Sequence, residues 1–142
     1  MTSVKINYQY IKDLSFEIPE SPEVFLTQNL KPDINLSINI DAKRLSVNSF
    51  EVILKISADA KGNDKKIFIC ELSYAGVFTL DESIQEQSEI EQILLIYCPN
   101  ILFPFARKII ANCTIDGNFP PLMLEPINFS DLYQKRSNQI AS

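Results

Sequence analysis

Few residues of this chain could carry catalytic chemistry. Its 142 residues include no histidine, which excludes Ser-His-Asp and Cys-His mechanisms within the chain and removes the usual nitrogen ligand of metals. Carboxylate, lysine and tyrosine chemistry remains, but no nucleophile and base stand in an arrangement that indicates a reaction. We therefore expect a protein that is not an enzyme, with no catalytic residue, no cofactor and no metal site.

The three cysteines, Cys70, Cys98 and Cys113, do not change this expectation. Their number is odd and none forms a CxxC pair, so neither a disulfide framework nor a zinc site is indicated. All three stand in apolar stretches, where a free cysteine acts as a small hydrophobe. Reduced cysteines fit a cytoplasmic protein.

The net charge of −5 makes nucleic acid an unexpected partner, because no basic stripe is present. An acidic surface attracts basic partners, although mild acidity also serves solubility alone. No continuous apolar run approaches the ~18 residues that span a bilayer. We expect no direct membrane insertion.

The first half of the chain has the period-two pattern of strands. Apolar residues alternate from Leu14, and again through residues 34–41, 47–60 and 66–80. The segment 61–64 (KGND) is a turn signal between the last two strands. These features predict an antiparallel sheet with one buried face.

A long connection, residues 19–32, separates the first two predicted strands. It is longer than a hairpin needs and contains the apolar cluster Val24, Phe25 and Leu26. Ordered loops of this length are often functional.

The second half changes to helical spacing from Ile90 onward. Pro99 and Pro104 should break or kink the helix, Gly117 is a plausible end, and Asn128 could cap a short final helix. The class is α+β: a four-stranded antiparallel sheet packed with a long kinked helix and a short C-terminal helix.

The predicted helix is apolar on more than one side. The stripe expected to face the sheet consists of Leu102, Phe105, Ala106, Ile109 and Cys113. Ile101, Phe103 and Ile110 fall outside this stripe, so a second surface must cover them. The loop 19–32 could do so within one chain, or a second protomer could.

Three segments of the sequence stand out together: YIKDLSFEIPESPEVF (10–25), CELSYAGVFTL (70–80) and CPNILFPFARKIIANCTIDGNFPPLMLEPINFSDLY (98–133). These segments resemble the SecB family of protein-export chaperones. The resemblance implies a single SecB-like chaperone domain over residues 1–142. It also implies an ATP-independent holdase of the bacterial cytoplasm that binds unfolded precursor polypeptides and delivers them to the SecA motor for export. The assembly implied is a homotetramer, a dimer of dimers with the long helices between the dimers.

Binding unfolded clients requires an apolar groove lined by adaptable side chains. The candidates lie on the long connection, near the long helix and after it: Val24, Phe25, Leu26, Leu30, Ile101, Leu102, Phe103, Phe105, Leu122 and Leu124. Each could equally be an ordinary core residue. Family members usually carry a tryptophan where this chain has Leu30, in a connection one residue longer here.

A second surface is implied by the resemblance at Asp13, Glu17, Ile69 and Glu71. In SecB proteins the matching positions form an acidic, partly apolar patch that docks the basic C-terminal tail of SecA. Spacing alone is also compatible with a solvated outer face of the sheet.

Two other functions remain open. One is an enzyme whose long helix is wrapped by a sheet, as in hot-dog thioesterases. No helical carboxylate of this chain stands out beyond Glu89 and Glu91, and these stand at a helix start, where the macrodipole explains acids. The other is a SecB-like protein dedicated to one partner, such as a toxin system, because fold does not determine the client.

Overall fold

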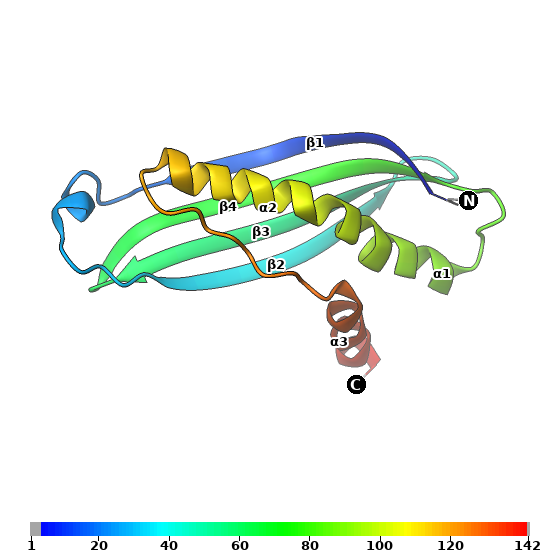
Figure 1. The fold of residues 1–142 in the computed structure, drawn as a ribbon. Helices are drawn as coiled ribbons and strands as arrows, with labels where there is room; N and C mark the ends of the chain where they lie inside the picture. The colour runs from blue at the N-terminus through cyan, green and yellow to red at the C-terminus, as the bar shows by residue number, and fades with distance from the viewer. Residues whose placement is uncertain (1–3, 142) are drawn as a thin grey trace.

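Four antiparallel strands form one sheet in the spatial order β1-β4-β3-β2 (Figure 1). The strands are β1 (Val4–Glu17), β2 (Asp33–Arg44), β3 (Ser49–Gly62) and β4 (Lys65–Leu80). The structure, a computed structural model, describes the backbone of residues 4–141 and the side chains of residues 4–136. The predicted antiparallel sheet is confirmed, and alternate side chains of β3 and β4 form its buried face.

Strand β1 begins at Val4, well before the start that the apolar alternation predicts. Its pairing with β4 shifts between Ile11 and Asp13, so Lys12 is an extra residue in the strand. Because side chains alternate with a period of two, one extra residue exchanges the faces of everything that follows. This bulge and a second register shift, between Ile6 and Tyr8, break the alternation in the sequence, and that is why the first half of the strand was missed.

Lys12 lies over the outer face of the sheet, the face away from the helix. Its Nζ atom is 2.8 Å from Oε1 and 3.0 Å from Oε2 of Glu51 on β3, and the hydroxyl of Tyr10 donates to the same carboxylate. Both side chains cross β4 to reach Glu51, close to Ala75, which is fully buried. Hydrogen bonds from Lys12 and then Tyr10 lower the pKa of Glu51, while burial and then the carboxylate raise the pKa of Tyr10 to about 12.

The turn predicted at residues 61–64 joins β3 to β4. Asn63 and Asp64 both have positive φ, 53° and 60°, which is the backbone of the two-residue turn that suits a right-twisted hairpin. This hairpin lies at the end of the sheet where β2 begins, because Asp33 pairs with Lys61.

The long helix is continuous from Gln87 to Asp116 and consists of α1 (Gln87–Gln92), the π-helical turn η2 (Ile93–Tyr97) and α2 (Cys98–Asp116). Pro99 and Pro104 were predicted to break or kink the helix, and neither breaks it. Pro99 stands in the first turn of α2, directly after η2. The π turn already interrupts the regular hydrogen-bond ladder there, and the missing N–H of proline is therefore accommodated.

By length and composition alone, this helix could cross a membrane, with a mean hydropathy of 1.5 over its most apolar window. The separate apolar runs are short, which is why the sequence did not suggest it. In the structure the helix lies along one face of the sheet (Figure 1), and 39% of that window is buried.

Helix α2 contacts β4 and β3 through residues spaced four apart. Cys98, Leu102, Ala106, Ile110 and Thr114 are all at 0% exposure. The predicted stripe was therefore partly wrong: Ile110 faces the sheet, whereas Phe105 is 48% exposed and Ile109 and Cys113 are half-buried. The sequence could not resolve this, because apolar residues occupy more than one side of the helix.

The chain after α2 returns along the molecule to a last helix, α3 (Phe129–Ala141). Gly117 ends α2 and Asn128 caps α3, its Oδ1 accepting from the backbone N–H of Asp131 at 3.1 Å. Both predictions are confirmed. We call residues 117–128 the return segment. Thr114 anchors it, because its Oγ1 accepts from the N–H of Leu122 at 2.9 Å.

The ion pair of Lys12 and Glu51 makes part of the stability depend on pH. Since the folded-state pKa of Glu51 is depressed, its contribution is full above the usual value of 4.5 and is lost as the pH falls through the lower folded value. We expect Glu51→Gln to reduce the free energy of unfolding at neutral pH by about 1–3 kcal/mol. The difference from the wild type should shrink below pH 4.5.

Urea unfolding of both proteins across this pH range, at one protein concentration, measures the effect. Glu82→Gln is the matched control, because Glu82 is exposed on the turn after β4. A difference between wild type and Glu51→Gln that stays constant with pH would contradict the assignment.

Candidate functional site

Four phenylalanines gather at one end of the molecule, beneath the connection between β1 and β2. We call them the aromatic cluster: Phe16 of β1, Phe68 of β4, Phe119 of the return segment and Phe25 of the 3-10 helix η1 (Glu23–Leu26). Ring centroids are 5.4 Å apart for Phe16–Phe68, 5.4 Å for Phe68–Phe119 and 5.6 Å for Phe119–Phe25. The rings form a continuous apolar path from the core to the surface, because Phe68 is buried and Phe25 is 41% exposed.

Hydrogen bonds hold the connection, residues 19–32, against the β3–β4 hairpin. The carboxylate of Glu20 accepts from the N–H of Lys66 at 2.6 Å, and Lys65 Nζ donates to Thr27 Oγ1 at 3.2 Å. Val24, 1% exposed, inserts into the core, while its neighbour Leu26 is 80% exposed. An ordered loop thus presents apolar side chains to solvent, an arrangement typical of binding surfaces.

The ten residues proposed to line a groove divide by accessibility. Val24, Leu102, Phe103 and Leu124 are buried core residues. Leu30, Ile101 and Leu122 are half-buried, and Phe25, Leu26 and Phe105 are exposed. The buried four can support the shape of a groove, but within this single chain they present almost no surface to a ligand.

Phe105 lies in a different place from the aromatic cluster. It stacks on Tyr74 of β4, with ring centroids 6.1 Å apart, and Tyr74 is opposite Ile11 in the β1–β4 pairing. Ile11 is also exposed. This flank of the helix, next to β1, is a second apolar surface.

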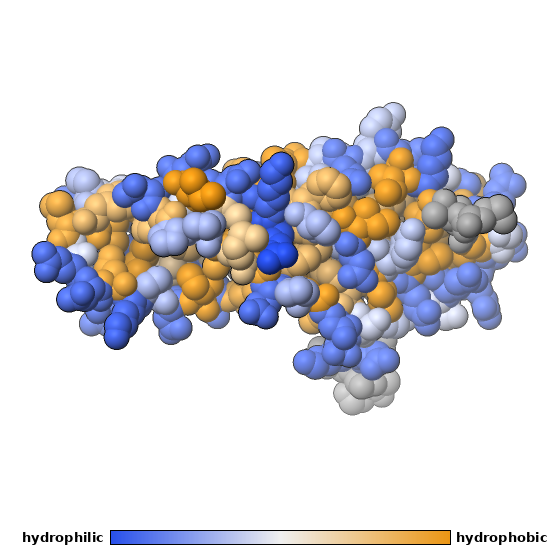
Figure 2. All heavy atoms as spheres, viewed as in Figure 1, coloured by the Kyte–Doolittle hydropathy of each residue, from blue (hydrophilic) through white to orange (hydrophobic). Residues whose placement is uncertain are grey.

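Sequence reasoning missed Phe119 and Met123 of the return segment. Met123 is 55% exposed, and Phe119 contacts both Phe25 and Phe68. A signal was present: the run NFPPLML puts apolar residues in a proline-rich extended segment that cannot bury them all by itself. Figure 2 shows apolar side chains at the surface of this end of the molecule, on the face that carries the helix.

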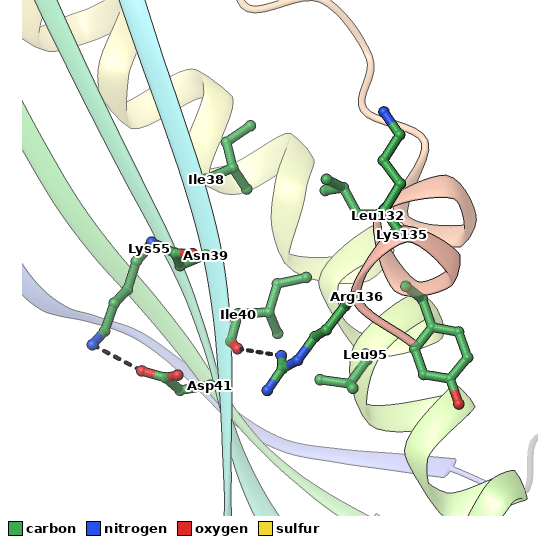
Figure 3. A pocket seen from close by; sticks show the side chains of 10 residues that line it. Ile38, Asn39, Ile40, Asp41, Lys55, Leu95, Leu132, Lys135 and Arg136 are labelled. Carbon is green, nitrogen blue, oxygen red and sulfur yellow. Dashed lines mark hydrogen bonds and ion pairs between the residues drawn. The ribbon is translucent and has the colours of Figure 1, made fainter. Parts of the chain in front are cut away.

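A separate hollow of about 560 Å³ lies between β2, η2 and α3 (Figure 3). Ile38 and Ile40 of β2, Leu95 of η2 and Leu132 of α3 form its apolar part. Lys135 and Arg136 of α3 stand at its rim, and Arg136 Nη1 donates to the carbonyl of Ile40 at 3.3 Å. Ile34 and Leu36 of β2 are exposed, whereas Ile38 and Ile40 are half-buried. Apolar side chains of β2 therefore continue from the end with the aromatic cluster to this hollow.

The outer face of the sheet carries the four residues proposed for docking. Glu17 is directly opposite Ile69 in the β1–β4 pairing, and Glu71 is opposite Ser15, two residues from Asp13. Asp13, Glu17 and Glu71 are exposed and Ile69 is half-buried. The structure therefore brings these four residues together on one surface, which we call the acidic face.

A shallow hollow of about 230 Å³ lies within this face. Asp13 and Glu71 line it, together with Ser37, Ser57 and Lys55. Ile56 and Leu72 also line it, and its small size suits a single side chain rather than a whole small-molecule ligand.

No arrangement within residues 4–136 resembles a catalytic or metal centre. The cysteines are free, and burial raises the pKa of Cys70 and of Cys98 to about 12, so these thiols stay protonated and unreactive. Among the described residues no three His, Cys, Asp or Glu side chains converge as metal ligands would.

The sequence matches the family described as preprotein translocase subunit SecB over residues 1–140. The protein-export protein SecB of Parvibaculum lavamentivorans is 46% identical over 136 residues, 96% of this chain and 80% of that protein. That of Rickettsia bellii is 46% identical over 140 residues, 98% of this chain and 91% of that protein.

A solved structure has a similar fold: a SecB-like chaperone of Mycobacterium tuberculosis in complex with a ChAD peptide from the HigA1 antitoxin. The TM-score is 0.67 at 17% identity, over 88% of this chain and 91% of that one. Identity at this level shows the fold alone. The family match over almost the whole sequence and the relatives at 46% identity show that this chain belongs to the SecB family of preprotein translocase subunits.

Proposed function

We propose that this protein is a holdase that binds unfolded precursor polypeptides through apolar grooves and delivers them to the SecA motor. The observation that carries the proposal is the exposed pair Phe25 and Leu26, which an ordered loop holds at the end of the aromatic cluster. The protein acts without ATP and without catalysis in this proposal, since apolar burial alone provides the binding energy.

The magnitude of apolar burial fits reversible holding. About 600 Å² of client apolar surface corresponds to roughly 15 kcal/mol gross, at ~25 cal/mol/Å². Ordering a flexible client removes much of this, so one groove binds weakly to moderately. A folded client hides its long apolar stretches, and selectivity for unfolded chains therefore needs no sequence code.

The exposed flank beside β1 supports an oligomer. Ile11 and Phe105 lie there and are exposed in the described chain, and a second protomer is the partner we propose, in a homotetramer built as a dimer of dimers. Several grooves on one assembly would raise the apparent affinity for a long client through effective concentration. The proposed location is the bacterial cytoplasm.

The acidic face is the proposed docking site for the basic tail of SecA. Asp13, Glu17 and Glu71 provide the charge and Ile69 an apolar contact within one paired region of β1 and β4. This face is on the opposite side of the sheet from the aromatic cluster, so docking and client holding can occur together.

A dedicated single partner, such as an antitoxin, is the alternative. The relatives that are 46% identical are named protein-export proteins, whereas the antitoxin-bound chaperone is 17% identical. These identities favour export, and binding of many unrelated unfolded precursors would separate the two functions.

The first test is refolding of a chemically unfolded export precursor with stoichiometric protein and no nucleotide. We expect delayed refolding, no complex with the folded precursor, and no effect of ATP or a chelator. Absence of both delay and complex would overturn the holdase proposal.

Leu26→Ser should weaken client holding several-fold with little change in the free energy of unfolding, because this side chain is already 80% exposed. Val47→Ser is the matched control, since Val47 is 89% exposed in the β2–β3 turn at the other end of the sheet. Client dissociation constants for both variants measure the effect. Equal weakening by the two would argue against a local groove.

Glu71→Lys should weaken SecA docking by tenfold or more, because it places a positive charge opposite a basic tail. A tenfold loss corresponds to about 1.4 kcal/mol of binding free energy. Client holding should remain intact. Glu82→Lys is the control, because it makes the same charge change at an exposed residue in the turn after β4, outside this face. Calorimetric titration with SecA and the refolding assay provide the two readings, and parallel loss of both activities would contradict separate surfaces.

A further inference from the structure

Two lysines that border the acidic face are each held by a carboxylate outside the proposed docking set. Lys12 pairs with Glu51 at 2.8 Å, and Lys55 pairs with Asp41 at 2.8 Å. Among side chains 4–136 these are the two ion pairs, and neither uses Asp13, Glu17 or Glu71. The three docking carboxylates thus keep their charge available to a partner.

The geometry places both lysines where their charge matters. Lys12 directly precedes Asp13 in the chain, and Lys55 lines the same hollow as Asp13 and Glu71. A unit charge at a distance of about 6 Å from a partner's cation still changes its affinity by roughly threefold in water, and by more near a protein surface.

Glu51 differs from the docking carboxylates in its accessibility. It is 7% exposed and accepts from Tyr10 as well as Lys12, so its oxygens are already occupied and a docking tail has little access to them. Lys12 itself keeps 45% of its side-chain surface. Glu51 therefore influences the charge of the acidic face indirectly, through its ion pair with Lys12.

We propose that Glu51 sets the preference of the acidic face for a basic partner by neutralising Lys12 and drawing its ammonium away from Asp13. This inference rests on the proposed docking function. Asp41 does the same for Lys55, more weakly, because both members of that pair are about half exposed.

A purely structural role makes a different prediction from charge masking. If the ion pair only held β1 in register, removing either partner would disturb Asp13 and weaken docking. If Glu51 masks a charge, removing Glu51 is harmful only while Lys12 is present. The double variant decides between the two explanations.

The experiment measures calorimetric dissociation constants for SecA with the wild type and with Glu51→Gln, Lys12→Met and the double variant, at two salt concentrations. We expect Glu51→Gln to weaken docking about three- to tenfold at low salt and less at high salt. Lys12→Met should bind at least as tightly as the wild type, and the double variant should match Lys12→Met. Circular dichroism and client holding verify that each variant is folded.

Two results would overturn the inference while the docking function stands. In one, Glu51→Gln and Lys12→Met weaken docking alike, and the pair is structural. In the other, neither changes docking although Glu71→Lys abolishes it. If SecA does not bind the wild type, or binds Glu71→Lys equally well, the docking proposal fails and this inference fails with it.

Discussion

The long helix contacts the sheet through one narrow stripe of residues. The width of this stripe determines how much apolar surface of the sheet stays uncovered. Residues spaced four apart, from Cys98 to Thr114, place α2 on β3 and β4, and the η2 turn of the helix also reaches β2. The flanking strands β1 and β2 therefore keep apolar side chains that the helix does not cover. On one side the connection and the return segment partly cover them, and on the other side the flank with Phe105 stays open. A wider helical contact would have buried the apolar surface that a binding protein needs.

The bulge at Lys12 gives the two faces of the sheet their different characters. Because one extra residue exchanges the faces, Phe16 can enter the aromatic cluster while Asp13 and Glu17 stand on the acidic face. Without it, the same sequence would place carboxylates against the core and a phenylalanine in water. The bulged residue, Lys12, is also the lysine that pairs with Glu51. The same bulge therefore affects both the register of β1 and the charge of the outer face.

The separation of the two proposed surfaces has a physical advantage for a carrier. Apolar side chains gather on the helix side and unpaired carboxylates on the outer side, with the sheet between them. In the proposed function, a client held by apolar burial on the helix side would leave the docking carboxylates uncovered. In this proposal, binding and delivery are governed by different forces, one that salt does not screen and one that it does.

The sequence by itself determined the strands with unbroken alternation, the 61–64 turn, the cap at Asn128 and the class of fold, because these depend on interactions between near neighbours. It also brought Asp13, Glu17, Ile69 and Glu71 to attention through resemblance. Only the tertiary structure decided that Val24, Leu102, Phe103 and Leu124 are buried, that Phe119 joins Phe25, and that Glu51 pairs with Lys12. Burial and pairing of this kind depend on contacts between residues far apart in the chain, and an apolar residue has the same one-dimensional pattern whether the fold covers it or leaves it exposed.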